Sequence, residues 1–292
     1  MKYEAISKLI GQFSVVRMCE TLGVKSQNYY RGRIQESKRE EKRLAEILLI
    51  KRIEKIFNDS DKTYGYRVIK RELEEQDVLI SEYKIRKIMR ENGFYPQTTS
   101  KYKPAKSGKT DVKYYCNKLK QNFKTSKPNE VWVGDITYIK TTIGWVYLAV
   151  VVDLFNREII GYAISKKINA ELTKQALTNA ITKRGTCDGL IFHSDRGSQY
   201  SSKTYQKLLK EHKISGSMSR PGCPYDNSCV ESFFATLKKE RIYRRSYFEI
   251  EDFRRDMFKY IELFYNRKRR HSYLGYVSPI KYRNEYERRK IA

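Results

Sequence analysis

The amino-acid sequence predicts an α/β domain over residues 128–292, preceded by small all-α modules. Three apolar runs with strand character follow one another between residues 131 and 165, separated by short turns. Helical and strand patterns then alternate to about residue 241. The first 95 residues instead show short helical patterns broken by turns. A chain of 292 residues is long enough for one large core and small satellite modules.

The first module is expected over residues 1–58. Residues 13–30 contain two short helical patterns broken at Gly23, which can end a helix in the left-handed conformation. This arrangement is typical of a helix-turn-helix. Apolar residues recur at helical spacing from Glu36 to Phe57 and predict an amphipathic helix that connects this module to the next.

A second helix-turn-helix is predicted over residues 59–95. Apolar residues recur at helical spacing on both sides of a short turn, and Ser81 can cap the second helix. That helix also carries four basic residues, Lys84, Arg86, Lys87 and Arg90. We expect them to contact DNA, although a helix pair that only packs together is the alternative.

Residues 96–127 have the composition of a basic linker. The segment contains few apolar residues, nine lysines from Lys101 to Lys127, and Asp111 as its single acid. It is either a solvated tether or a segment that condenses on phosphates. We expect it to become ordered only on DNA.

From Pro128 onward the pattern is that of a mixed α/β fold. The predicted elements, in chain order, are strands at 131–140, 145–153 and 157–165, a helix at 170–183, a strand at 190–193, a helix at 202–212, a strand at 214–218 and a helix at about 228–241. This is the order of an RNase H-like fold, in which helices pack against a mixed sheet. The domain over 128–292 is expected to end in a basic helical tail.

The charge of the chain is strongly basic. It contains 60 Lys and Arg residues against 34 Asp and Glu residues, which gives a formal net charge of +26. Such an excess repels itself unless the partner is strongly anionic, so nucleic acid is the expected partner. No apolar stretch is long enough to span a membrane and no signal peptide is evident, so we expect a cytoplasmic protein.

Three acidic residues stand where strand ends and a helix should converge. Asp135 lies within the first strand, Asp195 follows the fourth strand, and Glu231 lies near the start of a helix, with 35 residues (196–230) between the last two. A carboxylate in an apolar strand needs a counter-charge, and oxygen ligands select Mg²⁺ or Mn²⁺. Two such ions, about 3.5–4 Å apart, support phosphoryl transfer, so we expect two divalent ions here.

Each of these acids also has a simpler interpretation. Asp135 alone could be a partly exposed strand residue, and Asp195 could be a turn former. Glu231 could complete a helix capping box that begins at Ser228. Their combination at this spacing favours the catalytic interpretation.

The sequence resembles the insertion-sequence transposases of the IS-three family, specifically the second-frame, OrfB-type product, which is related to retroviral integrases. The similar motifs cover nearly the whole chain and lie at residues 64–94, 132–138, 193–197, 217–220, 225–227, 231–234, 264–271 and 274–279. The resemblance implies an integrase-type core in which Asp135, Asp195 and Glu231 bind the catalytic metals.

The resemblance also implies DNA contacts close to these acids. A basic residue that contacts terminal DNA in the family falls at Lys238, for which a solvated lysine is the alternative. Arg196, Arg220, Tyr225 and Asn227 flank the acids on loops, where substrate-positioning groups are usually found.

Two further features stay open. His193 is either a packed core histidine or a residue of the active site. The basic run at residues 267–270, beside Tyr265, Tyr273 and Tyr276, is either a stacking surface for nucleic acid or a plain exposed helix end.

The implied activity is metal-dependent cleavage at the ends of an insertion sequence, followed by strand transfer. The implied partners are double-stranded DNA, with terminal inverted repeats and target DNA, further copies of this chain, and the family's first-frame product; the implied location is the bacterial cytoplasm at the nucleoid. One rival is a ribonuclease H or a junction resolvase, which needs no helix-turn-helix grip on DNA ends. The other is a regulator that only binds DNA, against which the presence of all three acids argues.

Overall fold

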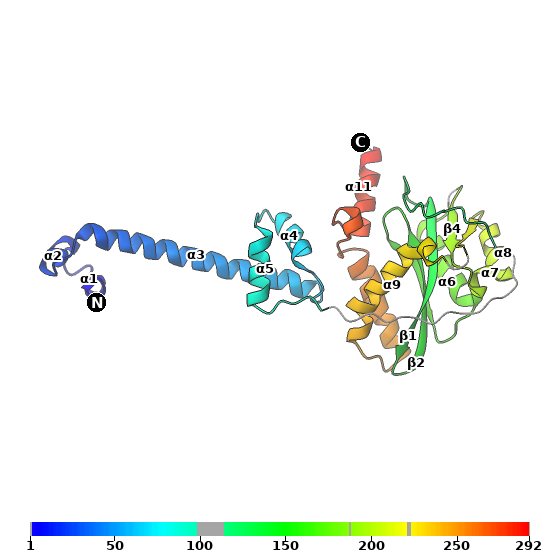
Figure 1. Ribbon diagram of the computed structural model, residues 1–292, viewed down its shortest axis with the longest axis horizontal. Coiled ribbons are helices and arrows are strands. Elements are labelled where there is room, and N and C mark those ends of the chain that lie inside the picture. The colour runs from blue at the N-terminus through cyan, green and yellow to red at the C-terminus, as the bar shows by residue number, and fades with distance from the viewer. Residues whose placement is uncertain (1, 98–113, 187, 221–222, 292) are drawn as a thin grey trace. The chain divides into compact units, whose positions relative to one another are not determined.

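The computed structural model describes residues 2–97, 114–186, 188–220 and 223–291. The chain divides into two compact units, Met1–Tyr95 and Pro96–Ala292. The first unit is helical in its described part, and the second contains a five-stranded sheet (Figure 1). No helix in the described part of the chain is long and apolar enough to cross a membrane.

The first unit begins with the helices α1 (Lys2–Lys8), α2 (Val15–Thr21) and α3 (Ser26–Asp59). Gly23 lies between α2 and α3 with a φ of +62°, so the predicted left-handed turn is confirmed. The predicted start of a separate helix near Glu36 was wrong, because α3 runs unbroken through this point (Figure 1). Residues 33–46 are mostly Arg, Lys, Glu, Leu and Ala, which favour a helix and provide no stop signal.

The second helix-turn-helix consists of α4 (Tyr66–Glu74) and α5 (Glu82–Glu91). The Ser81 hydroxyl accepts a hydrogen bond from the Lys84 backbone N–H at 3.3 Å, as expected of a helix cap. The last turns of α3 pack against both helices, and the buried side chains of this core are Leu49, Ile53, Ile56, Phe57, Ile69, Leu73, Ile85, Ile88 and Met89.

The second unit is built on a mixed sheet in the order β3-β2-β1-β4-β5. Its strands are β1 (Val131–Thr141), β2 (Gly144–Asp153), β3 (Ile159–Ser165), β4 (Ile191–Ser194) and β5 (Ser215–Met218). The first three strands pair antiparallel, whereas β4 pairs parallel to β1 and β5 pairs parallel to β4. The predicted RNase H-like strand order and mixed sheet are confirmed.

Helices cover both faces of this sheet (Figure 1). On one face lie α6 (Ala170–Arg184), the short α7 (Ser198–Ser201) and α8 (Lys203–Glu211), which pack on a core that includes Trp132. On the other face α9 (Ser228–Glu240) packs with Val131 and Val133. Successive side chains of β1 therefore point to opposite faces of the sheet, as they do in any β-strand.

The C-terminal segment belongs largely to the core. It contains α10 (Ile250–Phe258), a π-helix (Lys259–Tyr265) and α11 (Pro279–Ile291). Phe253, Met257 and Ile261 are fully buried in the cluster that includes α9. The expectation of a basic helical tail therefore holds only for α11, whose last turn is basic.

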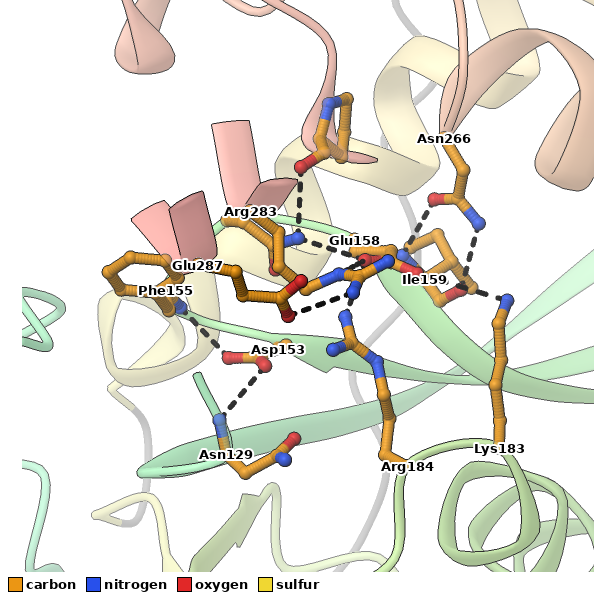
Figure 2. A network of polar contacts seen from close by, with 12 residues as sticks. Asn129, Asp153, Phe155, Glu158, Ile159, Lys183, Arg184, Asn266, Arg283 and Glu287 are labelled. Carbon is orange, nitrogen blue, oxygen red and sulfur yellow. Dashed lines mark hydrogen bonds and ion pairs between the residues drawn. The ribbon is translucent and has the colours of Figure 1, made fainter. Parts of the chain in front are cut away.

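A buried polar network ties this segment to the sheet (Figure 2). The carboxylate of Glu158, which is 1% exposed, accepts hydrogen bonds from Arg184 at the end of α6 and from Arg283 on α11. The Asn266 side chain makes two 2.9 Å hydrogen bonds with the backbone of Ile159 in β3. Because unpaired charges are costly to bury, this network fixes how α6 and α11 meet the sheet.

The segment before β1 also packs on the core. Leu119 is 5% exposed in the α9-side cluster, and the Lys118 backbone N–H donates to the Ser217 hydroxyl at 2.9 Å. A Cβ added at Gly216 would lie 2.5 Å from the ring of Tyr115, so β5 leaves room for that ring. The expectation that this linker becomes ordered only on DNA was wrong for residues 114–127, and residues 98–113 lie outside the described part of the chain.

Candidate active site

Two of the three candidate acids lie side by side because β1 and β4 are parallel neighbours. Pairing between these strands ends at Val133 and His193. Asp135 follows two residues later on β1, and Asp195 follows the last residue of β4. The third acid, Glu231, lies in the first turn of α9, which packs on β1.

Charge repulsion links the three carboxylates. Burial, followed by the charge of Asp195, raises the pKa of Asp135 well above its usual range, and the charge of Glu231 raises it further. Burial also raises the pKa of Asp195 and that of Glu231. The three acids thus share one region in which a negative charge is unfavourable.

Backbone N–H groups orient two of these acids. The Ile136 N–H donates to Oδ1 of Asp135 at 2.8 Å, and the Gly197 N–H donates to Oδ1 of Asp195 at 2.9 Å. A Cβ at Gly197 would lie 3.0 Å from that Oδ1 atom, so a glycine lets the turn wrap closely around the carboxylate. Both side chains are held in place by their own local backbone.

The side chain of Asn227, at the N-terminus of α9, is buried against β1. Its Nδ2 atom lies 3.5 Å from the carbonyl oxygen of Gly134, the residue before Asp135, and its Oδ1 atom has no hydrogen-bond partner among the described residues. Asn227 is 5% exposed, so it faces the strand of Asp135, not the surface.

Whether these groups can hold a divalent ion depends on their spacing and chemistry. Within the described ranges, no three His, Cys, Asp or Glu side chains are grouped closely enough to form a metal cage. The donor set nevertheless suits Mg²⁺ or Mn²⁺, because it consists of carboxylate oxygens that repel one another, with the unpartnered amide oxygen of Asn227 near Asp135. The chemistry of these donors therefore fits the ions, whereas their spacing in this structure does not form a complete cage.

Lys238 supplies positive charge to this region. It lies on α9, and its charge lowers the pKa of Asp135. Its Nζ atom is also 5.2 Å from the ring centroid of Tyr138. Burial lowers the pKa of Lys238, while Asp135 opposes this shift.

The basic residues predicted on the neighbouring loops make contacts within the protein. The Arg196 Nε donates to the carbonyl oxygen of Ser219 at 2.8 Å, and its guanidinium lies 4.7 Å above the ring of Tyr114. Arg220 forms an ion pair with Asp226, with 3.4 Å between Nε and Oδ2. The side chain of Tyr225 lies outside the described residues.

Asp226 is a site residue that the sequence did not single out. Its carboxylate is fully buried and accepts hydrogen bonds from Asn117 (2.8 Å), Gln121 (2.9 Å) and the Arg220 backbone N–H (2.9 Å). Burial alone would raise its pKa, but the hydrogen bonds from Arg220 hold the pKa at about 2. The sequence signal that could have identified Asp226 is its position beside Asn227, directly before the helix that carries Glu231.

The structure answers the question about His193. Its ring is fully buried, with Nδ1 at 2.8 Å from the Ser217 hydroxyl and Nε2 at 3.2 Å from the Ser219 hydroxyl. Burial lowers the pKa of His193 to about 4, so the ring is neutral at pH 7. It is a packed core histidine that joins β4 to β5.

The basic run at residues 267–270 also has a structural role. Arg269 forms an ion pair with Glu240 at the end of α9, with 2.8 Å between Nη2 and Oε1. Tyr265 is 3% exposed, so it offers no stacking surface. The stacking interpretation was therefore wrong for these two residues.

The basic residues predicted on α5 of the first unit are all exposed. Arg86 donates to the hydroxyl of Tyr66, and its guanidinium lies 4.0 Å from the centroid of that ring. Lys87 approaches Glu91 at 3.9 Å, which is a weak surface pair. Lys84 and Arg90 complete a basic face on the second helix of this helix-turn-helix.

Family models match parts of both units of the chain. Family models described as Integrase core domain match residues 125–224 and 212–279, and one described as HTH-like domain matches residues 43–102. The catalytic core domain of BIV integrase aligns at 19% identity with a TM-score of 0.43, over 56% of this chain and 99% of that one. The fold and the family models together define an integrase-core protein with a helix-turn-helix-like region.

Two relatives match nearly the whole chain. Transposase InsF for insertion sequence IS3A of Escherichia coli (strain K12) is 38% identical over 290 residues, which cover 98% of this chain and 99% of that protein. An IS600 protein of Shigella sonnei, described as an uncharacterized 31 kDa protein, is 35% identical over 92% of this chain and 98% of its own length. The chain belongs to the IS3 family of insertion-sequence transposases.

Proposed function

We propose that this transposase cleaves the ends of its insertion sequence and joins them to target DNA at the site formed by Asp135, Asp195 and Glu231. The observation that carries the proposal is the placement of Asp135 and Asp195 just beyond the point where the parallel pairing of β1 and β4 ends, where the charge of Asp195 raises the pKa of Asp135. Buried structural carboxylates are normally paired with cations, whereas Asp195 and Glu231 raise the pKa of Asp135 and the charge of Lys238 opposes them only in part.

The three carboxylates are proposed to hold two Mg²⁺ or Mn²⁺ ions. Such ions, when bound, supply the charge that activates a water or 3′-hydroxyl and stabilises the leaving oxygen in phosphoryl transfer. The local N–H donors keep Asp135 and Asp195 oriented, and α9 carries Glu231 toward them. The protein's own contribution is thus largely to position charge.

Lys238 is proposed to bind a phosphate of the DNA end. It lies on the same helix as Glu231, and its charge already acts on Asp135, so it extends the site toward an anionic substrate. Arg196 and Arg220 are proposed to contact DNA with the guanidinium donors that do not bind Ser219 and Asp226. Tyr225 and Asn227 are likewise proposed as DNA contacts.

The basic face of α5, formed by Lys84, Arg86, Lys87 and Arg90, is proposed to bind double-stranded DNA at the terminal inverted repeats. Removing one side chain that binds a phosphate should reduce the slope of log affinity against log salt by about 0.9. A quadruple alanine variant that kept the wild-type slope would remove this face from the DNA interface. Assembly of several copies on DNA, cooperation with a first-frame product and a location at the nucleoid are parts of the same proposal.

Nicking of DNA separates this function from its rivals. The purified chain is incubated with a fragment that carries the matched inverted repeats, with and without Mg²⁺, and with an RNA–DNA hybrid of the same sequence. The proposal predicts metal-dependent nicking at the repeat ends and no preference for the hybrid. Preference for the hybrid would indicate a ribonuclease H, and binding without nicking would indicate a regulator.

A melting experiment tests the metals separately from catalysis. Because metal binding relieves carboxylate repulsion in the native state alone, Mg²⁺ or Mn²⁺ should raise the melting temperature. At ten times the dissociation constant the stabilisation is about 1.4 kcal/mol. The shift should be absent in the Asp135→Ala/Asp195→Ala variant, and an equal shift there would place the ions elsewhere.

A further inference from the structure

Two exposed aromatic side chains lie next to each other on the hairpin of β1 and β2. Tyr138 is 37% exposed and Trp145 is 48% exposed, and their ring centroids are 5.7 Å apart at an interplanar angle of 70°. Neither residue belongs to the clusters that form the two sides of the core. The other tryptophan, Trp132, is fully buried.

The register of the sheet explains this exposure. Pairing of β4 with β1 covers only Val131–Val133, and pairing of β3 with β2 begins at Tyr147. Tyr138 lies beyond the limit of β4, opposite Tyr147, where the pairing of β2 with β3 ends. Trp145 lies beyond the limit of β3, nearer the turn of the hairpin. The two rings are thus carried on the β1–β2 ladder where one or both neighbouring strands have ended.

The aromatic pair is next to the candidate active site. Tyr138 follows Asp135 by three residues on the same strand, so the two side chains leave opposite faces of the sheet, and Lys238 is the residue that links them. The Nζ atom of Lys238 lies 5.2 Å from the Tyr138 ring centroid, and the charge of the same lysine acts on Asp135. Lys238 therefore lies close to the Tyr138 ring and close enough to Asp135 for its charge to act on that acid.

Exposed rings beside a cation have the chemistry that binds an unstacked nucleotide. A nucleobase stacks on an aromatic ring whatever its sequence, and a nearby lysine neutralises the adjoining phosphate. The edge-to-face pair stabilises the hairpin modestly, and the exposed area that the two rings leave can be covered by a base that has left its duplex, which exposes its own apolar faces. The formal net charge of +26 attracts DNA to the chain as a whole, and Lys238 supplies the positive charge beside the rings.

We propose that Tyr138 and Trp145 form a stacking site for an unpaired nucleobase at the DNA end, with Lys238 on its phosphate. This inference rests on the proposed function, since it places the DNA end at Asp135, Asp195 and Glu231. The pair would hold the end open and keep the reacting strand apart from its complement.

A fluorescence titration without metal tests the stacking site while no cleavage takes place. The probe is a duplex with one overhanging 2-aminopurine nucleotide, whose emission falls when the base stacks, and the control probe is the same duplex with the fluorophore paired inside. The full chain should quench the overhanging base, and the Trp145→Phe variant should retain this quenching because a ring remains. Tyr138→Ala/Trp145→Ala should abolish it, while Phe258→Ala, which removes a ring that is 50% exposed on α10, should not.

Tryptophan emission gives a second readout from the protein side. The difference between wild type and Trp145→Phe isolates the signal of Trp145, because Trp132 is common to both. The overhanging duplex should change this difference signal, and a blunt duplex should change it much less. Equal quenching of 2-aminopurine by wild type and the double alanine variant, or an unchanged Trp145 signal, would overturn the proposal.

Cleavage with Mg²⁺ then distinguishes failure of the stacking site from failure of the proposed function. Loss of stacking on one base should slow cleavage of a fully paired end by about 5- to 150-fold, and an end with its terminal pair already mismatched should recover part of this loss. If the double variant cleaved as fast as wild type, the stacking site would be contradicted and the proposed function would stand. If wild type gave the stacking signals but did not cleave, the proposed function would be contradicted and the stacking site would stand.

Discussion

The Asn117 side chain donates a hydrogen bond to the buried carboxylate of Asp226, with 2.8 Å between Nδ2 and Oδ2. The two residues are 109 positions apart in the chain. Gln121 donates to the other carboxylate oxygen at 2.9 Å. The segment that leads into the core thus helps to hold the loop that leads into the helix of Glu231.

A truncation series tests this relationship. A chain that begins at residue 114 keeps the hydrogen bonds of Asn117 and Gln121 and the buried side chain of Leu119, whereas one that begins at residue 128 lacks all three. Loss of a buried leucine alone costs about 2–5 kcal/mol. We expect the shorter chain to be less stable by about 3 kcal/mol or more in urea unfolding, and equal stability of the two chains would contradict the docking of this segment.

The basic run at residues 267–270 provides a matched pair of substitutions. Arg269 is paired with Glu240 in a largely buried site, while Arg267 is exposed. Because Arg269→Ala leaves the Glu240 carboxylate without its cation, we expect a loss of about 3 kcal/mol. Arg267→Ala should change the free energy of unfolding by less than about 0.5 kcal/mol. Equal effects in thermal or urea unfolding would mean that the ion pair does not form in solution.

Asp153, at the end of β2, predicts a pH dependence of stability (Figure 2). Burial raises its pKa to about 6, although the backbone N–H groups of Asn129 and Phe155 oppose this. A raised pKa means that its contribution to stability is complete below about pH 4 and is lost as the pH rises through about 6.

Asp153→Asn removes this titration and keeps a side-chain oxygen as acceptor. The stability of the variant relative to wild type should therefore increase by up to about 3 kcal/mol between pH 4 and pH 7. Asp188→Asn, at an exposed position, serves as the control. A stability difference that stays constant over this range in urea unfolding would show that Asp153 does not titrate there.

The elements of the sheet were predictable because their signals are local. The strand patterns between residues 131 and 165 identified the antiparallel β1, β2 and β3, and they located Asp135 within β1. The strand before Asp195 and the helix of Glu231 were equally evident, since each is a short apolar pattern next to turn residues. The order of these elements was enough to recognise the fold.

Other features depend on contacts between distant parts of the chain, which composition does not reveal. The middle of α3 is polar on all sides, so its continuity follows from the absence of a stop signal more than from any apolar stripe. Residues 114–127 looked like a solvated tether because their few apolar side chains stand among lysines and other polar residues. Tyr115, Leu119 and Phe123 nevertheless pack on the core, and Asn117 and Gln121 bind the distant Asp226. Nothing in the run at 267–270 distinguishes Arg269, which is paired, from Arg267, which is exposed.

The most direct test of the central claim is the cleavage rate of Asp135→Ala, Asp195→Ala and Glu231→Gln on DNA that carries the terminal repeats, with binding to the same DNA measured in parallel. We expect each variant to lose cleavage while binding the DNA about as tightly as wild type. Because the acids act as a unit, the cleavage rate of a double variant should be little lower than that of a single one. Cleavage near the wild-type rate by any one of them would contradict the assignment of that acid to the active site.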